Sequence, residues 1–200
     1  MVENNAMNEH YYTKKPTSFV KENTIKEILR GEELTFITSS GLFSPKKIDK
    51  GTKLLIEESL ICSEDKILDL GCGYGVVGIS IKKKFPKTKI TLLDVNERAL
   101  SYAKKNSELN KTEVEIVEKL KNKTFNTILL NPPQSAGKKI CFELINLSNE
   151  HLSTGGSLQI VARHKKGGKL LETYMNQLFG NVEVIARKSG YKIYLSKKLN

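Results

Sequence analysis

An α/β fold is predicted by three features of this 200-residue sequence. Short apolar runs typical of buried strands, such as 66–70, alternate with segments whose apolar residues recur at helical spacing. A glycine-rich turn over 71–78 joins that strand to a helix. The β-rich segment 182–195 is interrupted by Ser189-Gly190, which is typical of a hairpin. We therefore expect a single Rossmann-like doubly wound sheet of about seven strands, mostly parallel with an antiparallel C-terminal hairpin.

The length suits one domain with a substantial core. We expect residues 1–34 to form an N-terminal extension, partly flexible, with a short helix from Thr17 to Arg30, and residues 35–200 to form the domain. The expected helices cover 52–60, 76–81, 98–110, 137–152 and 170–179. The expected strands cover 66–70, 89–95, 112–118, 125–130 and 156–162, followed by the hairpin strands 182–185 and 192–195. Ligands of such a sheet bind at the carboxyl ends of its strands.

The glycine-rich turn is the first candidate for a binding site. Its candidate residues are Asp69, Gly71, Cys72, Gly73, Tyr74 and Gly75. Glycine permits positive φ and lets a ligand approach where a Cβ would collide, and the N–H groups that begin the next helix face that ligand. The turn therefore predicts a nucleotide-like cofactor.

The charge of Asp69 separates two cofactor classes. Gly73-x-Gly75-x-x-Gly78 matches the dinucleotide fingerprint, so a nicotinamide-dependent oxidoreductase is one alternative. A carboxylate at the mouth of the turn would repel a pyrophosphate, whereas it would attract the sulfonium and ammonium groups of S-adenosylmethionine. We therefore favour S-adenosylmethionine. The other interpretation is that Asp69 only caps the following helix or accepts from loop amides.

A second carboxylate supports a ribose-containing cofactor. Asp94, followed by Val95 and Asn96, ends the β-rich run that begins at Lys89. A carboxylate at the tip of a neighbouring parallel strand can accept hydrogen bonds from both ribose hydroxyls. Asp94 could equally cap the helix that follows, and the two roles are compatible.

The loop Asn131-Pro132-Pro133, after the strand 125–130, indicates the reaction. Two consecutive prolines fix φ and offer no N–H, so the loop presents carbonyl acceptors beside the Asn131 carboxamide. Such acceptors would hold the two hydrogens of a planar amino group while its nitrogen lone pair faces a donor methyl group. We expect these three residues to form the catalytic site of an N-methyltransferase.

With these motifs in place, the sequence resembles the class I S-adenosylmethionine-dependent methyltransferases. Within them it is similar to the small-subunit ribosomal RNA guanine exocyclic-amine methyltransferases and their compact archaeal-type relatives, from about Thr35 to the end. The segment 40–55, which contains Thr52, looks like the family's pre-motif segment over the cofactor. The resemblance implies that Asp94 binds the ribose, the glycine turn cradles the methionine portion, and Asn131 with the Pro132 carbonyl holds the target amine.

Two positions depart from that family. Many relatives have an aromatic residue after the prolines to stack on the target base, but here the residue is Gln134. We expect Gln134 to contact the substrate, and Phe43 is our candidate for the stacking ring. Relatives often carry an acid near the adenine amino group after the third strand, where Glu118 could serve or could be a solvated strand-end residue. The departure at Gln134 also leaves a non-catalytic cofactor-binding module as an alternative.

The amino-acid composition indicates which kinds of partner and location to expect for this protein. The formal net charge is +11, which favours a polyanion such as RNA, and Lys46, Lys47 and Lys138 flank the expected substrate mouth. No apolar run approaches the ~18 residues of a membrane span, and no leader pattern is evident, so we expect a cytoplasmic protein. The three cysteines show no zinc-like spacing, so no metal is expected.

The most specific expectation is methylation of a guanine exocyclic amine in ribosomal RNA. A glutamine amide of a protein and an adenine amine are rivals, because the Asn-Pro-Pro loop suits any planar amine. We expect in-line transfer that depends on orientation and electrostatics, with no general base evident in the sequence. The sequence does not indicate the oligomeric state.

Overall fold

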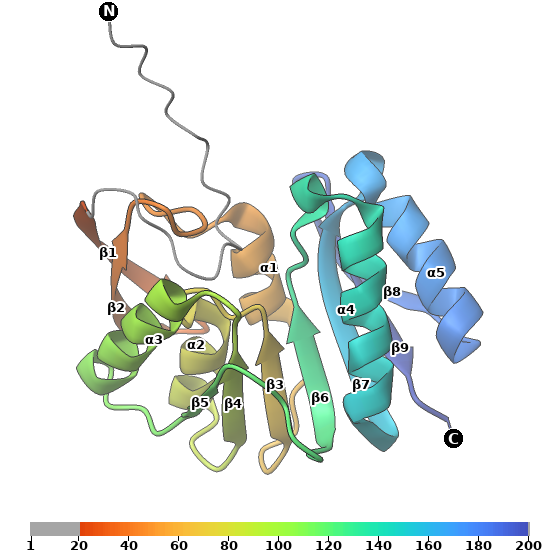
Figure 1. Ribbon diagram of the computed structural model, residues 1–200, viewed down its shortest axis with the longest axis horizontal. Coiled ribbons are helices and arrows are strands. Elements are labelled where there is room, and N and C mark those ends of the chain that lie inside the picture. Colours follow the sequence, from red (N-terminus) through yellow and green to blue (C-terminus); the bar gives the residue numbers. More distant parts are fainter. Residues whose placement is uncertain (1–20, 200) are drawn as a thin grey trace, which may run out of the picture.

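The computed structural model describes residues 21–199, which form a seven-stranded sheet and a separate two-stranded hairpin (Figure 1). The strands of the large sheet are β3 (Lys66–Leu70), β4 (Lys89–Leu93), β5 (Glu115–Val117), β6 (Phe125–Leu130), β7 (Leu152–Arg163), β8 (Glu183–Lys188) and β9 (Tyr191–Lys197). The helices are α1 (Lys50–Glu58), α2 (Val76–Lys84), α3 (Glu97–Leu109), α4 (Lys138–His151) and α5 (Lys169–Phe179). Strands β1 (Glu22–Leu29) and β2 (Glu32–Ser39) form the hairpin.

The large sheet has the strand order β5-β4-β3-β6-β7-β9-β8. The first five strands in this order pair in parallel, while β9 pairs antiparallel with both β7 and β8. The chain places β4 and β5 on one side of β3 and then crosses over to place β6 on the other side. Because β3 and β6 pair in parallel, their carboxyl ends lie side by side. The predicted fold class, including the antiparallel C-terminal hairpin, is confirmed.

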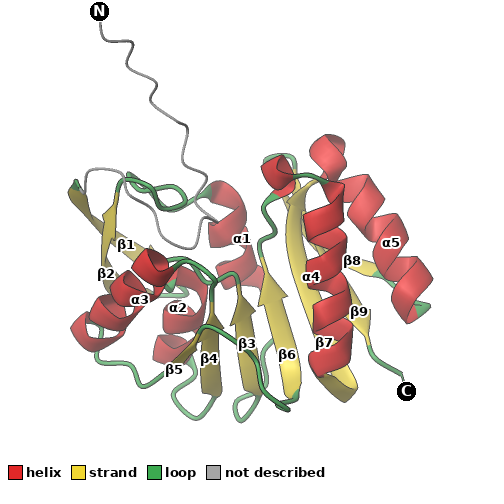
Figure 2. Ribbon diagram, viewed as in Figure 1, coloured by secondary structure: helices red, strands yellow, loops and turns green. Residues whose placement is uncertain are grey.

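Helices pack on the sheet (Figure 2), and the apolar side chains buried on both of its faces explain the continuous apolar runs in its strands. On one face, Ile67 and Leu92 pack with residues of α1, α2 and α3. On the other, Leu68 and Ile128 pack with residues of α4 and α5. The two cores hold the strands from both sides, so the loops at their carboxyl ends rest on a rigid base.

The expected helix from Thr17 to Arg30 is wrong where the structure describes it. Residues 22–29 form strand β1, and Arg30 and Gly31 make the turn to β2 with positive φ values of 49° and 79°. Ile25 and Leu29 are buried and lie four residues apart, a spacing that fits one face of a helix as well as alternate positions of a strand. The pairing partner β2 was not expected, and it runs across the expected domain boundary at residue 35. The division of the chain stays a prediction, and residues 1–20 lie outside the described part.

Candidate active site

The three motifs singled out in the sequence follow neighbouring parallel strands. The glycine turn follows β3, Asp94 follows β4, and Asn131 follows β6, with β3 paired to both of the others. The amides of Gly71 and Cys72 both donate to the carbonyl of Leu93, at 2.8 and 2.9 Å, so the turn is folded over the end of β4. The tertiary structure thus brings the three motifs to one edge of the sheet.

The glycines of the turn have two different physical roles. Gly71 and Gly73 have φ values of 71° and 56°, and a Cβ at either would meet no protein atom within 4 Å. These positions therefore need glycine for their conformation and leave open space above the turn. A Cβ at Gly78 would instead come within 2.2 Å of Leu92 Cδ2, so this glycine permits close packing of α2 on β4.

The Asp69 carboxylate is buried beneath the turn. The residue is 3% exposed, and its Oδ2 accepts a hydrogen bond from the Gly78 amide at 2.8 Å. Burial raises the pKa of Asp69 to about 7, the Gly78 hydrogen bond opposes that shift, and the charge of Asp94 adds to it. This geometry matches the alternative interpretation of Asp69, in which its carboxylate accepts a hydrogen bond from an amide at the start of the following helix. Its attraction for a sulfonium stays a prediction.

Asp94 joins two loops of the site. Its Oδ2 accepts from the Gly73 amide at 2.8 Å, and its Oδ1 accepts from the Asn96 amide at 2.9 Å. Burial raises the pKa of Asp94, while these hydrogen bonds lower it. The Asn96 side chain is buried and caps α3 through Ala99 N, whereas Val95 is 56% exposed. Of these neighbours, Val95 is the one whose side chain faces out of the fold.

Two buried side chains of the turn pack inward. Tyr74 Oη donates to the carbonyl of Ser44 at 3.4 Å, and its ring meets Phe36 edge to face at 6.2 Å. Burial raises the pKa of the Cys72 thiol, and the nearby carboxylates of Asp69 and Asp94 add to that rise. A thiol held protonated in this way is a small packing group and a poor nucleophile.

Asn106 connects the glycine turn to the N-terminal hairpin and was not anticipated from the sequence. Its Nδ2 donates to the carbonyls of Tyr74 and Ile37, both at 2.9 Å, and its Oδ1 accepts from the Ile37 amide at 2.7 Å. Because all three partners are backbone atoms distant in the chain, no local pattern around Asn106 marks this role.

Asn131 is oriented by Thr52. The Asn131 Nδ2 donates to Thr52 Oγ1 at 2.9 Å, and Thr52 lies in the first turn of α1. Asp49 caps that helix, because its Oδ2 accepts from the amides of Gly51 and Thr52 at 2.7 and 3.1 Å. In a planar carboxamide, fixing the nitrogen also fixes the direction of Oδ1, the acceptor that a substrate amine would need. Thr52 was expected among the cofactor residues, and here its hydroxyl contacts Asn131.

The two proline carbonyls each accept one hydrogen bond within the loop. The Pro132 oxygen accepts from the Gln134 amide, and the Pro133 oxygen accepts from the Ala136 amide, both at 2.8 Å. A carbonyl oxygen has two lone pairs, so the Pro132 oxygen retains one further position for an external donor, whereas the Pro133 oxygen also accepts from Cys141 Sγ at 3.9 Å. The Pro132 carbonyl therefore keeps an acceptor position, and its contact with a substrate amine stays a prediction.

Gln134 is bound at both ends of its amide. Its Oε1 accepts from the backbone amide of Arg163 and its Nε2 donates to the Lys166 carbonyl, each at 2.9 Å. These contacts join the loop after β6 to the irregular helical turn His164–Gly168 that follows β7. In this structure Gln134 holds two loops together, whereas the sequence suggested a substrate contact.

The remaining predicted site residues lie on the surface around the carboxyl ends of the strands and do not form one cluster. Phe43 is 38% exposed in the loop between β2 and α1, and Glu118 is exposed directly after β5. Lys46, Lys47 and Lys138 are also exposed, the last at the start of α4. Their proposed contacts with substrate or adenine stay predictions.

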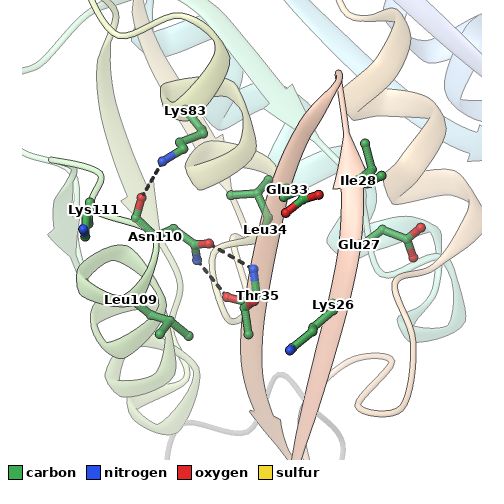
Figure 3. Close-up of a pocket in the computed structure, with 10 residues that line it drawn as sticks. All are labelled: Lys26, Glu27, Ile28, Glu33, Leu34, Thr35, Lys83, Leu109, Asn110 and Lys111. Carbon is green, nitrogen blue, oxygen red and sulfur yellow. Dashed lines mark hydrogen bonds between the residues drawn. The ribbon is translucent and has the colours of Figure 1, made fainter.

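A hollow of about 770 Å³ lies away from this edge, between the β1–β2 hairpin and helices α2 and α3 (Figure 3). Its polar groups are largely engaged within the protein. Asn110 Oδ1 accepts from the Thr35 amide, and Asn110 Nδ2 donates to the Thr35 carbonyl. Lys83 Nζ donates to the backbone carbonyl of Asn110 at 3.2 Å. The hollow therefore offers little of the converging polar chemistry found at the strand ends.

Within residues 21–199, no group of three or more His, Cys, Asp or Glu side chains could hold a metal ion. No helix in that part of the chain is long and apolar enough to cross a membrane.

Comparisons with known proteins agree on one family. Residues 33–195 match the family model described as "Methyltransferase small domain". The Bacillus subtilis (strain 168) protein named "Uncharacterized protein YbxB" is 40% identical over 203 residues, covering 96% of this chain and 100% of that protein. "Ribosomal RNA small subunit methyltransferase C" of Haemophilus influenzae (strain PittGG) is 34% identical over 175 residues, covering 83% of this chain and 52% of that protein. The chain thus spans about half the length of this second relative.

Solved structures share the fold. One described as "T. Thermophilus 16S rRNA N2 G1207 methyltransferase (RsmC) in complex with AdoMet and Guanosine" has a TM-score of 0.77 and 20% identity. The match covers 92% of this chain and 52% of that one. A methyltransferase from Pyrococcus furiosus has a TM-score of 0.60 and 23% identity, with 68% of this chain and 76% of that one covered.

Proposed function

Because this chain belongs to the methyltransferase small domain family, we propose that it is an S-adenosylmethionine-dependent N-methyltransferase that modifies a guanine exocyclic amine in ribosomal RNA. The observation that carries the proposal is the Asn131 carboxamide, held by Thr52 beside the glycine turn and Asp94 at one edge of the sheet. The relatives named as small-subunit ribosomal RNA methyltransferases, and the neighbour solved with guanosine, support the substrate class.

The residues at the strand ends suit S-adenosylmethionine. Gly71 and Gly73 leave open space above the turn for the methionine portion, and Asp94 would accept the ribose hydroxyls. Val95 and Asn96 would border the ribose, and Glu118 would lie near the adenine amino group. The buried charge of Asp69 would favour a cationic sulfonium when that carboxyl is ionised.

When bound, S-adenosylmethionine supplies an electrophilic methyl group. The chain's contribution is to orient the nucleophile. With its Nδ2 bonded to Thr52, Asn131 would present Oδ1 to one amine hydrogen, and the Pro132 carbonyl would accept the other. These bonds increase the electron density on a nitrogen whose lone pair is otherwise delocalised into the base. Asn131 and the Pro132 carbonyl would hold the amine while its nitrogen takes the methyl group that the sulfonium would supply, and the amine would release one proton to water. Pro133 keeps the loop rigid, so the amine is held in line.

The RNA would lie across an exposed basic surface. Lys46, Lys47 and Lys138 border the expected substrate mouth, and the net charge of +11 favours binding of phosphates. The target guanine would have to be unpaired or turned out of a helix to reach Asn131. Phe43 is the exposed ring proposed to stack on it. A ribosomal RNA substrate would place the protein in the cytoplasm.

The test is incubation of the purified protein with methyl-labelled S-adenosylmethionine and unmodified small ribosomal subunits, free ribosomal RNA, transfer RNA and protein extract. We expect label in RNA, recovered as N2-methylguanosine after digestion to nucleosides. Label in N6-methyladenosine or in glutamine would support a rival amine within the same chemistry. Calorimetry should show binding of S-adenosylmethionine and not of NADH, and the reverse preference would contradict the proposal.

A further inference from the structure

A circuit of hydrogen bonds, linked through the covalent bonds of the residues that make them, closes on the Asn131 loop. Beyond Thr52, the Asp49 carboxylate that caps α1 also accepts from Tyr191 Oη, through its Oδ1 at 3.2 Å. Tyr191 Oη in turn accepts from Arg163 Nε at 3.0 Å. The backbone amide of Arg163 donates to Gln134 Oε1, which returns the circuit to the loop after β6. We call these connected residues the loop ring: Asn131, Thr52, Asp49, Tyr191, Arg163 and Gln134.

The loop ring joins four parts of the fold that lie far apart in sequence. Asp49 and Tyr191 are separated by 142 positions, and Asn131 and Thr52 by 79. Tyr191 begins β9 and Arg163 ends β7, so the ring anchors the loop to the antiparallel side of the sheet. A hydrogen-bonded ring of this kind fixes the loop from both ends, because α1 holds Asn131 and β7 holds Gln134.

Tyr191 is the central member of the ring. It is 8% exposed, its hydroxyl has both a donor and an acceptor partner, and the Arg163 guanidinium lies 5.1 Å from its ring centroid. A Cβ at Gly51 would come within 2.6 Å of the Tyr191 ring, so the start of α1 is packed directly against this side chain. Packing and hydrogen bonding therefore both set the position of the helix turn that carries Thr52.

From this arrangement we propose that Tyr191, Arg163 and Gln134 are positioning residues for methyl transfer, acting through the orientation of Asn131. The proposal rests on the proposed function and assigns a catalytic purpose to the C-terminal strands. These residues do not touch the reacting atoms. They hold the Asn131 carboxamide in the one direction that receives the target amine, and small errors in such orientation lower rates strongly.

The main variant is Tyr191→Phe, which keeps the ring packing and removes the hydroxyl. We expect kcat to fall by about fivefold or more, with the KM for RNA and the Kd for S-adenosylmethionine unchanged within about twofold. Tyr194→Phe is the matched control, since Tyr194 is a fully buried tyrosine of β9 whose hydroxyl contacts His164 Nδ1 at 2.9 Å outside the loop ring. An equal fall in kcat for both variants would overturn the proposal.

A double-mutant cycle tests the route through Asn131. If Tyr191→Phe and Thr52→Val both act by releasing the Asn131 carboxamide, the double variant should lose little more kcat than either single variant. Losses that multiply would show independent effects and would overturn the proposal.

The side-chain amide signal of Asn131 in an NMR spectrum of the isotope-labelled protein provides a readout that needs no substrate. Tyr191→Phe and Gln134→Met should each shift the Asn131 Nδ2 resonance and speed exchange of its hydrogens, and Tyr194→Phe should not. An unchanged Asn131 signal in Tyr191→Phe would overturn the proposal even if the enzyme is active. If wild-type protein methylates no RNA, the proposed function fails, and this spectrum still decides whether the ring orients Asn131.

Discussion

Asn131 donates a hydrogen bond from Nδ2 to Oγ1 of Thr52 over 2.9 Å, and this bond joins the loop after β6 to the first turn of α1. The bond leaves the carboxamide oxygen as the acceptor available to a substrate. Asn131→Ala should therefore abolish methyl transfer while the Kd for S-adenosylmethionine changes little. Single-turnover assays and calorimetry on the same preparation would measure both, and equal loss of the two would contradict the role of Asn131.

Thr52→Val replaces the hydroxyl by a methyl group of similar size. Because one neutral hydrogen bond contributes about 1 kcal/mol, we expect the transfer rate to fall by about fivefold. Thr52→Ser retains the oxygen and is the control, with a rate near that of the wild type. If the Ser and Val variants behave alike, the hydroxyl does not orient Asn131.

Asp94 links the glycine turn to the end of β4, and its carboxylate is the proposed ribose acceptor. Asp94→Ala should raise the Kd for S-adenosylmethionine by about tenfold or more, since hydrogen bonds to a charged group contribute about 1.5–3 kcal/mol. Calorimetry measures this change, with Glu113→Gln, an exposed acidic position, as the control. A Kd equal to that of the wild type would refute the ribose contact.

Asp69 makes stability depend on pH. Its pKa is raised to about 7 in the folded protein from 3.8, so the folded state binds this proton more tightly than the unfolded state. The free energy of unfolding should then fall as pH rises from about 4 to about 7, by at most about 4 kcal/mol from this group. Urea unfolding of wild type and Asp69→Asn at pH 5 and pH 7.5 checks this. A slope that is the same in both proteins would show that Asp69 is not its source.

Two glycine variants should separate packing from ligand binding. Gly78→Ala places a methyl group 2.2 Å from Leu92 Cδ2 and should destabilise the fold by about 1–3 kcal/mol. Gly71→Ala meets no protein atom, so its cost is the positive φ of 71°, about 1–2 kcal/mol, together with weaker cofactor binding. Thermal unfolding and calorimetry distinguish the two. Unimpaired binding of S-adenosylmethionine by Gly71→Ala would contradict a cofactor above the turn.

The parts of the fold that sequence reasoning located are those specified by local patterns. The strands at 66–70 and 125–130 were recognised because both of their faces are buried, which requires continuous apolar runs. The N-terminal hairpin was missed for the opposite reason. The spacing of Ile25 and Leu29 suits a helix as well as a strand, and β1 is decided by its pairing with β2.

The sequence by itself determined the sheet, the positive-φ turn after β3 and the polar residues at the strand ends, because each depends on neighbours in the chain. Only the tertiary structure decided what those residues contact. It directed Thr52 to Asn131, Gln134 to the backbone at the end of β7, and Tyr191 to the cap of α1. Such hydrogen bonds join atoms that are distant in sequence, and no local spacing encodes them until packing of α1 and the C-terminal strands on the sheet brings the atoms within reach.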